Sequence, residues 1–559
     1  MMKKQCMVFL LLMTVFVAFA QDEQKEIKKE EVVVEFSFRP TLSDVFKLKT
    51  SPEANVYFEK KEITYQTKSK VVLSDFIPTP KKVIYVNIDE SKPTNFYNYV
   101  YGATGSYGNS EFEFFIQPKK NKKAIQYGIG LTSYHTQNGI NNKQVDNGQW
   151  KLDLDLYLAK EEKKLDWRAE INFQNNVVHW YGLPNATSID NGNKNIQQTY
   201  KDFSFAGKVN YKNVFLQNIT PSLRFFSDDM NSSEVNLNVE TELNHTLLGN
   251  HIQAKVDVQY LNGHFDQSFD NPSSINYSFF NIGITPSYRY KTTDFKMTTS
   301  LGLYLNSSQE KAKTNFLLLP KVQIDVALIK DIMSLRGGVR SELNQNSYAS
   351  LVSENPFVSP TLSIETTHVF FDLFTGLDGS LSKNIRYELE GSYRSINNQP
   401  LFLYNSRKDM VKKAYERGNS FGVVYDDVNI LSFKANVETL LSAYFKVGGL
   451  FVLNNFETET QNKAWNMSGV ELSSYVNFHK GNWVSQLGIN YVNGRYSLVE
   501  NETVKLRGFL DLNLKTGYEV NKKLKAHFNL YNILNNNYEL YTNYQVQRAQ
   551  ALIGLSYKF

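Results

Sequence analysis

From about residue 97 to its last residue, the chain repeats short segments in which apolar and polar side chains alternate. In "WKLDLDLYLA", Trp150, Leu152, Leu154, Leu156 and Leu158 alternate with Lys151, Asp153, Asp155 and Tyr157. Successive side chains of a strand point to opposite faces, so each segment predicts a strand with one apolar and one polar face. Many of these strands run for roughly ten to fifteen residues, which is long enough to cross a membrane when tilted.

Composition favours a membrane barrel over a soluble sandwich. The chain has 34 Tyr and 38 Phe, yet its mean hydropathy is polar, at −0.40. Beyond the N-terminal leader, no apolar stretch reaches the roughly 18 residues of a transmembrane helix. Strands that present one face to lipid and the other to water reconcile these observations. The sequence therefore predicts an all-β fold, a transmembrane antiparallel up-and-down β-barrel over residues 97–559.

The connections between the predicted strands give the strand number. Long and short connections alternate along the chain, as in outer-membrane barrels with long extracellular loops and short periplasmic turns. The alternation survives only if residues 359–379 form one long, bulged strand, and it then gives about 22 strands, an even number. Aromatic pairs near strand ends, such as Trp180 with Tyr181 and Phe225 with Phe226, are expected at the two membrane interfaces.

The N-terminus has the layout of a secretory signal peptide. Lys3 and Lys4 precede an apolar run, and Ala18 and Ala20 suit a peptidase site, so residues 1–20 are expected to be removed. The only cysteine, Cys6, lies within that peptide. The mature chain is therefore expected to have no disulfide, thiolate nucleophile or cysteine-bound metal.

Residues 21–96 differ from the rest of the chain because they contain none of its 30 glycines. Their charge density and lack of amphipathic periodicity predict an extended segment, in the periplasm or docked in the lumen, that builds no core of its own. A plain linker and a strap for the barrel or a partner both remain open. The strap hypothesis rests on "VEFSFRPTLSDVFKL" and its residues Phe36, Phe38, Arg39, Leu42 and Phe46.

The C-terminal segment resembles that of a known family. After an aromatic-Asn-aliphatic-Leu-Asn segment and a tyrosine, the last strand closes on a terminal Phe, as in TonB-dependent receptors. The matching positions are Tyr531, Asn532, Ile533, Leu534, Asn535, Tyr538 and Phe559. We expect this strand to pair with the first one, its C-terminus to be periplasmic, and Leu555, Tyr557 and Phe559 to form the barrel-assembly signal that such an end resembles.

The resemblance is incomplete, because residues 21–96 are too short and too poor in glycine for the family's plug domain. Lys/Asn/Tyr-rich composition and "ENPFVSPTL" are similar to plug-less barrels of Bacteroidota. That likeness implies an accessory or scaffold component of outer-membrane protein assembly or secretion, in a Gram-negative outer membrane. The alternative is a transporter, either a TonB-coupled importer or a passive pore closed by the N-terminal segment. "EEVVVEF" resembles a TonB box, which makes TonB a candidate partner.

Candidate sites are few. Asp153, Asp155, Asp166, Arg168 and Glu170 are expected to line the lumen as a polar cluster, either binding a cation or polar substrate or compensating one another's charges. The eight histidines are scattered along the sequence, and no Ser/His/acid arrangement can be recognised in it. We therefore expect no enzyme activity, cofactor or metal. The partners expected are outer-membrane lipid and other envelope proteins, and the formal charge of +5 gives no sign of nucleic-acid binding.

Overall fold

The computed structural model describes residues 98–118, 124–137, 139–140, 145–184, 196–212, 215–247, 250–330 and 332–559. The predicted signal peptide and the segment 21–96, with Phe36, Phe38, Arg39, Leu42 and Phe46, lie outside these residues. Within the described part of the chain, no helix is both long enough and apolar enough to cross a membrane.

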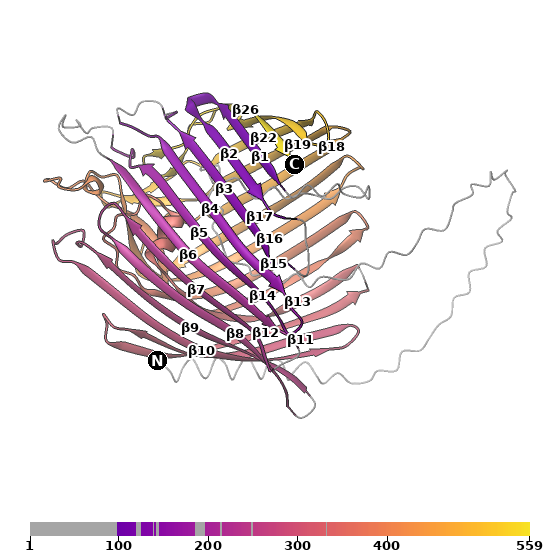
Figure 1. The fold of residues 1–559 in the computed structure, drawn as a ribbon. Coiled ribbons are helices and arrows are strands. Elements are labelled where there is room, and N and C mark those ends of the chain that lie inside the picture. The colour runs from indigo at the N-terminus through magenta and orange to yellow at the C-terminus, as the bar shows by residue number, and fades with distance from the viewer. Residues whose placement is uncertain are drawn as a thin grey trace, which may run out of the picture. The chain divides into compact units, whose positions relative to one another are not determined.

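The described chain forms a closed antiparallel β-barrel in which each strand pairs with its neighbours along the sequence (Figure 1). The barrel has 22 strands, as the spacing of the connections predicts. They are β1 (Tyr99–Gly105), β2 (Ser110–Ile116), β3 (Gln126–Thr136), β4 (Gln149–Glu161), β5 (Leu165–His179), β6 (Gln197–Tyr211), β7 (Leu216–Asp228), β8 (Ser233–Leu247), β9 (Asn250–Phe265), β10 (Ile275–Lys291), β11 (Phe295–Ser308), β12 (Lys313–Ile329), β13 (Met333–Gln345), β14 (Thr366–Ser382), β15 (Ile385–Tyr404), β16 (Phe421–Leu440), β17 (Phe445–Thr458), β18 (Val470–Lys480), β19 (Trp483–Asn493), β22 (Phe509–Glu519), β23 (Leu524–Tyr531) and β26 (Gln550–Lys558).

The last strand closes the barrel on the first. β26 pairs with β1 from Tyr99 opposite Lys558 to Gly105 opposite Leu552, so the expected pairing of the two ends is confirmed. The backbone N–H of Phe559 donates to the carbonyl oxygen of Asn98 at 3.1 Å, which extends the ladder to the final residue. A closed ladder leaves no unpaired edge strand.

The barrel wall has the two faces that the alternation predicts. On β12, the outward-facing Phe316 and Leu318 are 62% and 54% exposed, whereas Leu319, which follows them on the opposite face, is 4% exposed. Exposed Ile553 and Leu555 continue this apolar outer surface on β26. Such a surface is stable against hydrocarbon and unfavourable against water, which suits a membrane-spanning wall.

One end of the barrel carries short turns and the other carries long loops. A turn with Gly481 in the left-handed region (φ +58°) joins β18 to β19. Asn521 closes the β22–β23 turn by accepting the backbone N–H groups of Lys523 and Leu524, both at 2.9 Å. At the long-loop end lie two hairpins, β20 (Tyr496–Val499) with β21 (Glu502–Lys505) and β24 (Glu539–Tyr541) with β25 (Tyr544–Gln545). The same end carries the helix α2 (Tyr348–Glu354) and the 3-10 turns η1 (Ser106–Gly108) and η2 (Ala414–Glu416).

One strand boundary differs from prediction. Residues 359–379 were expected to form one strand, but β14 begins only at Thr366, with the expected bulge between Val369 and Phe371. Pro360 has no N–H to give to a ladder. The alternating Leu362 and Ile364 are 2% and 1% exposed, because they pack inside the barrel mouth and do not join the wall.

Candidate functional site: the capped end of the barrel

Loops from four connections meet inside the long-loop end of the barrel. We call residues 180–184, 346–365, 405–420 and 539–545 the cap; side chains from all four segments belong to one buried apolar cluster. Wall residues of β7, β9 and β10, among them Phe226, Leu261 and Tyr277, complete this cluster. The apolar core of the chain therefore lies at one end of the barrel, between the cap and the inner wall.

Helix α2 is fixed at its first turn by acids of the wall. Ser347 caps the helix by accepting the backbone N–H of Ser350 at 3.0 Å. The carboxylate of Glu234 on β8 accepts the N–H groups of Tyr348 (2.6 Å) and Ala349 (3.2 Å). A carboxylate at a helix N-terminus satisfies free N–H groups and opposes the helix dipole.

A second acid holds the tyrosine that begins the helix. The hydroxyl of Tyr348 donates to the carboxylate of Asp228 at 2.7 Å. The hydroxyl of Tyr277 on β10 donates to Glu234 at 2.7 Å, which joins the helix site to a third strand. Three wall strands thus share the attachment of α2.

The segment after α2 is stacked between aromatic side chains. The rings of Phe357 and Tyr544 lie 3.6 Å apart and nearly parallel. The carbonyl oxygen of Pro356 accepts from the indole N–H of Trp180 (3.2 Å) and from the hydroxyl of Tyr200 (2.7 Å). Trp180 and Phe226 are therefore inside the mouth, 0% and 5% exposed, and their expected place at a membrane interface is wrong.

The hairpin β24–β25 crosses to two other parts of the cap. The hydroxyl of Tyr541 donates to the backbone oxygen of Glu354 at 3.0 Å, and that of Tyr544 donates to the backbone oxygen of Asn419 at 2.5 Å. Arg495, which follows β19, donates to the backbone oxygens of Glu539 (2.8 Å) and Leu540. These bonds fix the hairpin to the helix segment, the 405–420 loop and the wall.

The 405–420 loop folds around the buried carboxylate of Glu416. That carboxylate accepts the backbone N–H groups of Lys412 (2.6 Å) and Lys413 (2.8 Å) and lies 3.3 Å from the Lys408 ammonium. Asn419 then ties the loop to the opposite connection by donating to the backbone oxygen of Trp180 at 2.7 Å. Each cap segment thus contacts at least one of the others.

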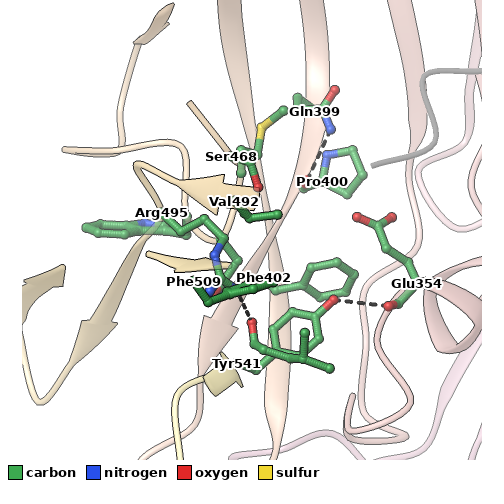
Figure 2. A pocket seen from close by; sticks show the side chains of 13 residues that line it. Glu354, Gln399, Pro400, Phe402, Ser468, Val492, Arg495, Phe509 and Tyr541 are labelled. Atoms are coloured by element: carbon green, nitrogen blue, oxygen red, sulfur yellow. Dashed lines mark hydrogen bonds between the residues drawn. The ribbon is translucent and has the colours of Figure 1, made fainter. Parts of the chain in front are cut away.

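Two small cavities remain inside the cap, of about 40 and about 100 Å³. Glu354, Leu540 and Tyr541 line both, so they form the partition between them. In the smaller cavity, Glu354 and Arg495 approach from opposite sides (Figure 2). Burial raises the pKa of the Glu354 carboxyl to about 7.

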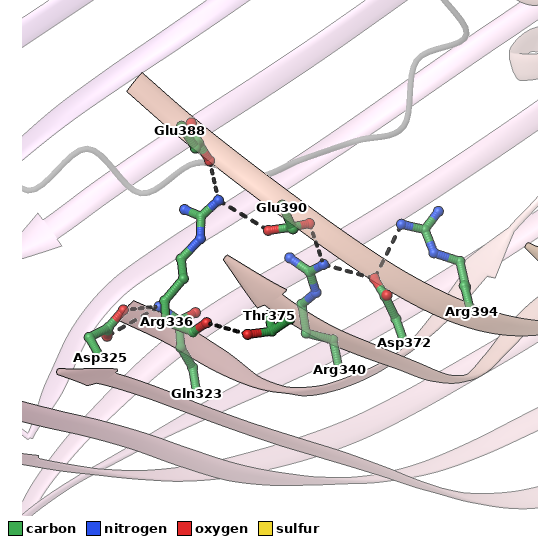
Figure 3. Close-up of polar contacts among 9 residues, drawn as sticks. All are labelled: Gln323, Asp325, Arg336, Arg340, Asp372, Thr375, Glu388, Glu390 and Arg394. Atoms are coloured by element: carbon green, nitrogen blue, oxygen red, sulfur yellow. Dashed lines mark hydrogen bonds and ion pairs between the residues drawn. The ribbon is translucent and has the colours of Figure 1, made fainter. Parts of the chain in front are cut away.

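Below the cap, the inner wall carries a ladder of ion pairs on β13, β14 and β15 (Figure 3). Arg340 bridges Asp372 (2.9 Å) and Glu390 (3.0 Å), and Arg394 reaches Asp372 at 3.2 Å. Arg336 bridges Glu390 (3.1 Å) and Glu388. The side chains of Asp372 and Glu390 are 6% and 8% exposed, and each of these carboxylates is paired with two guanidinium groups.

This ladder was not among the predicted sites. Its signal in the sequence is the even spacing within each strand: Arg336 and Arg340 lie four residues apart on β13, and Glu388 and Glu390 lie two residues apart on β15. Such spacing places charges on one face, but the pairing becomes visible only once the strand register is known.

The five residues of the predicted lumen cluster share one face of β4 and β5. Asp153 accepts from Gln174 at 2.6 Å, Asp155 accepts from Asn172, and Arg168 pairs with Glu170. Asp166 pairs with Lys212 at 2.7 Å. The members contact their own neighbours in a row along the wall and do not converge on one point. Within the described residues, no group of three or more His, Cys, Asp or Glu side chains could hold a metal ion.

The predicted assembly signal lies on the outer face of the last strand. Leu555, Tyr557 and Phe559 are exposed by 57%, 42% and 43%. The rings of Tyr557 and Phe559 stack with centroids 6.2 Å apart, at the short-turn end. Their recognition as a signal stays a prediction.

No protein-family model and no curated protein sequence matches this chain. Solved structures do. The FrpB iron transporter from Neisseria meningitidis is 9% identical, with a TM-score of 0.63 over 83% of this chain and 81% of that one. The ferripyoverdine receptor of the Pseudomonas aeruginosa outer membrane, bound to ferripyoverdine, is 13% identical, with a TM-score of 0.60 over 84% and 72%.

The fold is a closed 22-stranded barrel similar to the barrels of these outer-membrane proteins. A third solved structure, the copper transporter OprC, agrees with this at 11% identity and a TM-score of 0.60 over 83% of this chain and 80% of that chain. At such low identity the likeness concerns the fold. The Bacteroidota origin suggested by composition stays a prediction.

Proposed function

We propose that this chain is an outer-membrane transporter whose barrel is closed at the outer mouth by its own cap. The observation that carries the proposal is the cap, because its segments are bonded to one another and to wall strands around the ring. A 22-stranded wall encloses a lumen that large outer-membrane transporters keep plugged. Here the cap offers such a closure from the described residues alone.

The direction of the barrel follows from its two ends. Outer-membrane barrels carry long loops outside the cell and short turns in the periplasm. In the orientation that we propose, the cap faces the medium and the C-terminus faces the periplasm. The apolar outer wall would then contact outer-membrane lipid.

The solute is proposed from the structural neighbours. They are an iron transporter, a copper transporter and a receptor bound to ferripyoverdine. We infer import of a small solute of the metal-chelate kind, with TonB as the partner that supplies energy through the N-terminal segment. No catalytic role is needed for this task.

The expected role in outer-membrane protein assembly or secretion has no support in these neighbours. It remains a prediction from the resemblance to plug-less barrels. Both roles place the chain in the outer membrane, so location does not separate them, whereas conductance does.

Planar-bilayer conductance of the purified chain tests the transporter. The wild-type barrel should give small currents, because the cap fills its mouth. The double variant Glu234→Gln, Arg495→Ala loosens both α2 and the β24–β25 hairpin, and we expect it to give large, long-lived openings. Arg507→Ala is the matched control, since Arg507 is exposed in the same connection as Arg495. Currents that are equal in all three proteins would contradict closure by the cap.

A further inference from the structure

The cap contains one carboxylate that none of its fastening contacts uses. Glu354 ends α2, and its backbone oxygen accepts the hydroxyl of Tyr541 at 3.0 Å. Its carboxylate has no hydrogen-bond or ion-pair partner among the residues that the structure describes. It lines both cavities of the cap. A carboxylate that faces a cavity and has no donor of its own can accept hydrogen bonds from a cation in that cavity.

A second acceptor without a donor lines the larger cavity. Asn147 is only 6% exposed, and among the described residues its Oδ1 atom has no hydrogen-bond partner. Its amide nitrogen is used, because it donates to the backbone oxygen of Val145 at 3.4 Å. Asn466 repeats this arrangement in the smaller cavity: its Oδ1 has no partner and its amide donates to Phe402 at 2.7 Å. The smaller cavity also has an unmatched donor, the Nε atom of Arg495, whereas the unmatched buried atom of the larger cavity is an acceptor, which a donor would satisfy.

Aromatic rings form one part of the remaining wall of the larger cavity, beside aliphatic and polar side chains. Tyr134, Tyr181, Phe357, Tyr541 and Tyr544 all line it. Aromatic rings attract organic cations through their faces and also pack well against alkyl chains. An acid, an amide oxygen and aromatic rings together are the chemistry that recognises an amine.

We propose that the larger cavity binds a small primary ammonium ion, held by the Glu354 carboxylate and Asn147 Oδ1, with its alkyl chain against the aromatic rings. Its volume of about 100 Å³ is somewhat below that of an engineered cavity that takes benzene, which limits the ligand to about four or five non-hydrogen atoms. The site goes beyond the transport proposal, because binding does not require passage through the barrel.

The other ionisable groups that line the two cavities have contacts of their own, although the Nε atom of Arg495 has no hydrogen-bond partner among the described residues. Arg495 lies in the smaller cavity and donates to two backbone oxygens of the hairpin. His179 lines the larger cavity, with Nδ1 2.6 Å from the backbone oxygen of Gly148 and Nε2 3.5 Å from the Asp146 carboxylate. Glu354 is therefore the acid that an ammonium ion in the larger cavity would meet without displacing an existing partner.

The pKa of the Glu354 carboxyl provides a second test of the proposed site. Burial raises the pKa of this carboxyl to about 7, and an ammonium ion beside it would lower that pKa again. Binding should thus release a proton near neutral pH, and affinity should fall as the solution becomes more acidic than about 7. An alkylammonium ion stays charged over this range, because an aliphatic amine titrates near 10.4.

Calorimetric titration of the full chain in detergent with n-butylammonium chloride at pH 8 tests the site. We expect saturable binding to the wild type and a loss of at least about tenfold in affinity for Glu354→Gln, which keeps the side-chain shape and removes the charge. Glu310→Gln, in an exposed turn, is the matched control and should bind as the wild type does. 1-Butanol, with the same chain length and no charge, should bind at least about tenfold more weakly.

Three outcomes would overturn the site. The first is that the wild type does not bind butylammonium at concentrations below about 10 mM. The second is that butylammonium and butanol bind with equal affinity, and the third is that Glu354→Gln binds butylammonium as the wild type does. If Glu354→Gln fails to assemble, wild-type titrations decide: affinity must fall about tenfold per pH unit below pH 7, and a flat profile refutes the site. Conductance of the capped barrel is a separate measurement, so failure here leaves the transport proposal standing.

Discussion

The wall and the cap are built from the same chain by opposite means. In the wall, each strand bonds to its neighbours in sequence, and the ladder repeats from β1 to β26. In the cap, bonds join residues far apart: 114 positions from Glu234 to Tyr348, 187 from Glu354 to Tyr541 and 239 from Trp180 to Asn419. The wall distributes its stability over many equivalent bonds, whereas the cap depends on a few specific ones.

This difference has a consequence for mutation. The loss of a single hydrogen bond in the wall should matter little, because the wall has many equivalent bonds. Variants in the wall should therefore affect the protein mainly by changing its contacts with lipid and its assembly into the membrane. A single lost contact in the cap should loosen a whole segment while the barrel persists. The following variants test that contrast, in order of expected effect.

The largest effect is expected from the closing strand of the wall. Phe559→Asp places a charge on the outer surface beside Tyr557 and removes the terminal aromatic ring that the proposed assembly signal contains. We expect the amount of assembled protein in outer-membrane fractions, scored by heat-modifiable migration on gels, to fall at least about tenfold. Phe559→Leu keeps the apolar character and should retain most of it. Wild-type levels of Phe559→Asp would refute the signal.

In the cap, Glu234→Gln should release α2 without harming the wall. The substitution replaces a charged acceptor of two helix N–H groups, a change of about 2 kcal/mol, or roughly thirtyfold in local opening. Hydrogen exchange of residues 348–365 should accelerate by that factor, while exchange in the strands stays slow. Glu240→Gln lies on the same strand with an exposed side chain and is the control. Equal acceleration in both variants would show that Glu234 does not anchor the helix.

The same contrast explains what could be predicted from the sequence. Period-two alternation predicted the wall, and the alternation of long and short connections predicted its strand number, because a strand's faces and neighbours follow from local pattern. Helix α2 was not predicted. It has only seven residues, in a region that contains Ser, Val and Pro, and this length is too short to show a helical period of apolar residues. Trp180 looked like an interface aromatic, because its partner Pro356 lies 176 positions away and no local pattern joins them. The shared face of Asp155 and its neighbours could be predicted from one strand pair, and their role in the lumen stays a prediction, whereas the Arg340 ladder needed the register of three strands.

A pH effect confined to the cap is expected from Glu354. Because burial raises the folded-state pKa from 4.5 to about 7, the protonated carboxyl is favoured in the folded cap. Its contribution to cap stability is complete below about pH 4.5, falls as pH rises to 7 and stays low above it. Hydrogen exchange of residues 348–365, corrected for intrinsic rates, should show this loss between pH 5 and 7. The profile of Glu354→Gln should be flatter, and parallel profiles would contradict the assignment.

The smallest effect is expected from Tyr544→Phe, which removes one hydroxyl and keeps the ring stacked on Phe357. The lost bond leaves the backbone oxygen of Asn419 without this buried donor, at a cost of about 1 kcal/mol, or roughly fivefold in local opening. Exchange of residues 405–420 and 539–545 should rise by that factor, and exchange around α2 should change less. Tyr557→Phe, on the outer wall, is the control and should leave the cap unchanged. If the exchange rate rose in only one of the two segments, the hairpin and the loop would open independently. The cap would then consist of several independently opening segments and would not open as one cooperative unit.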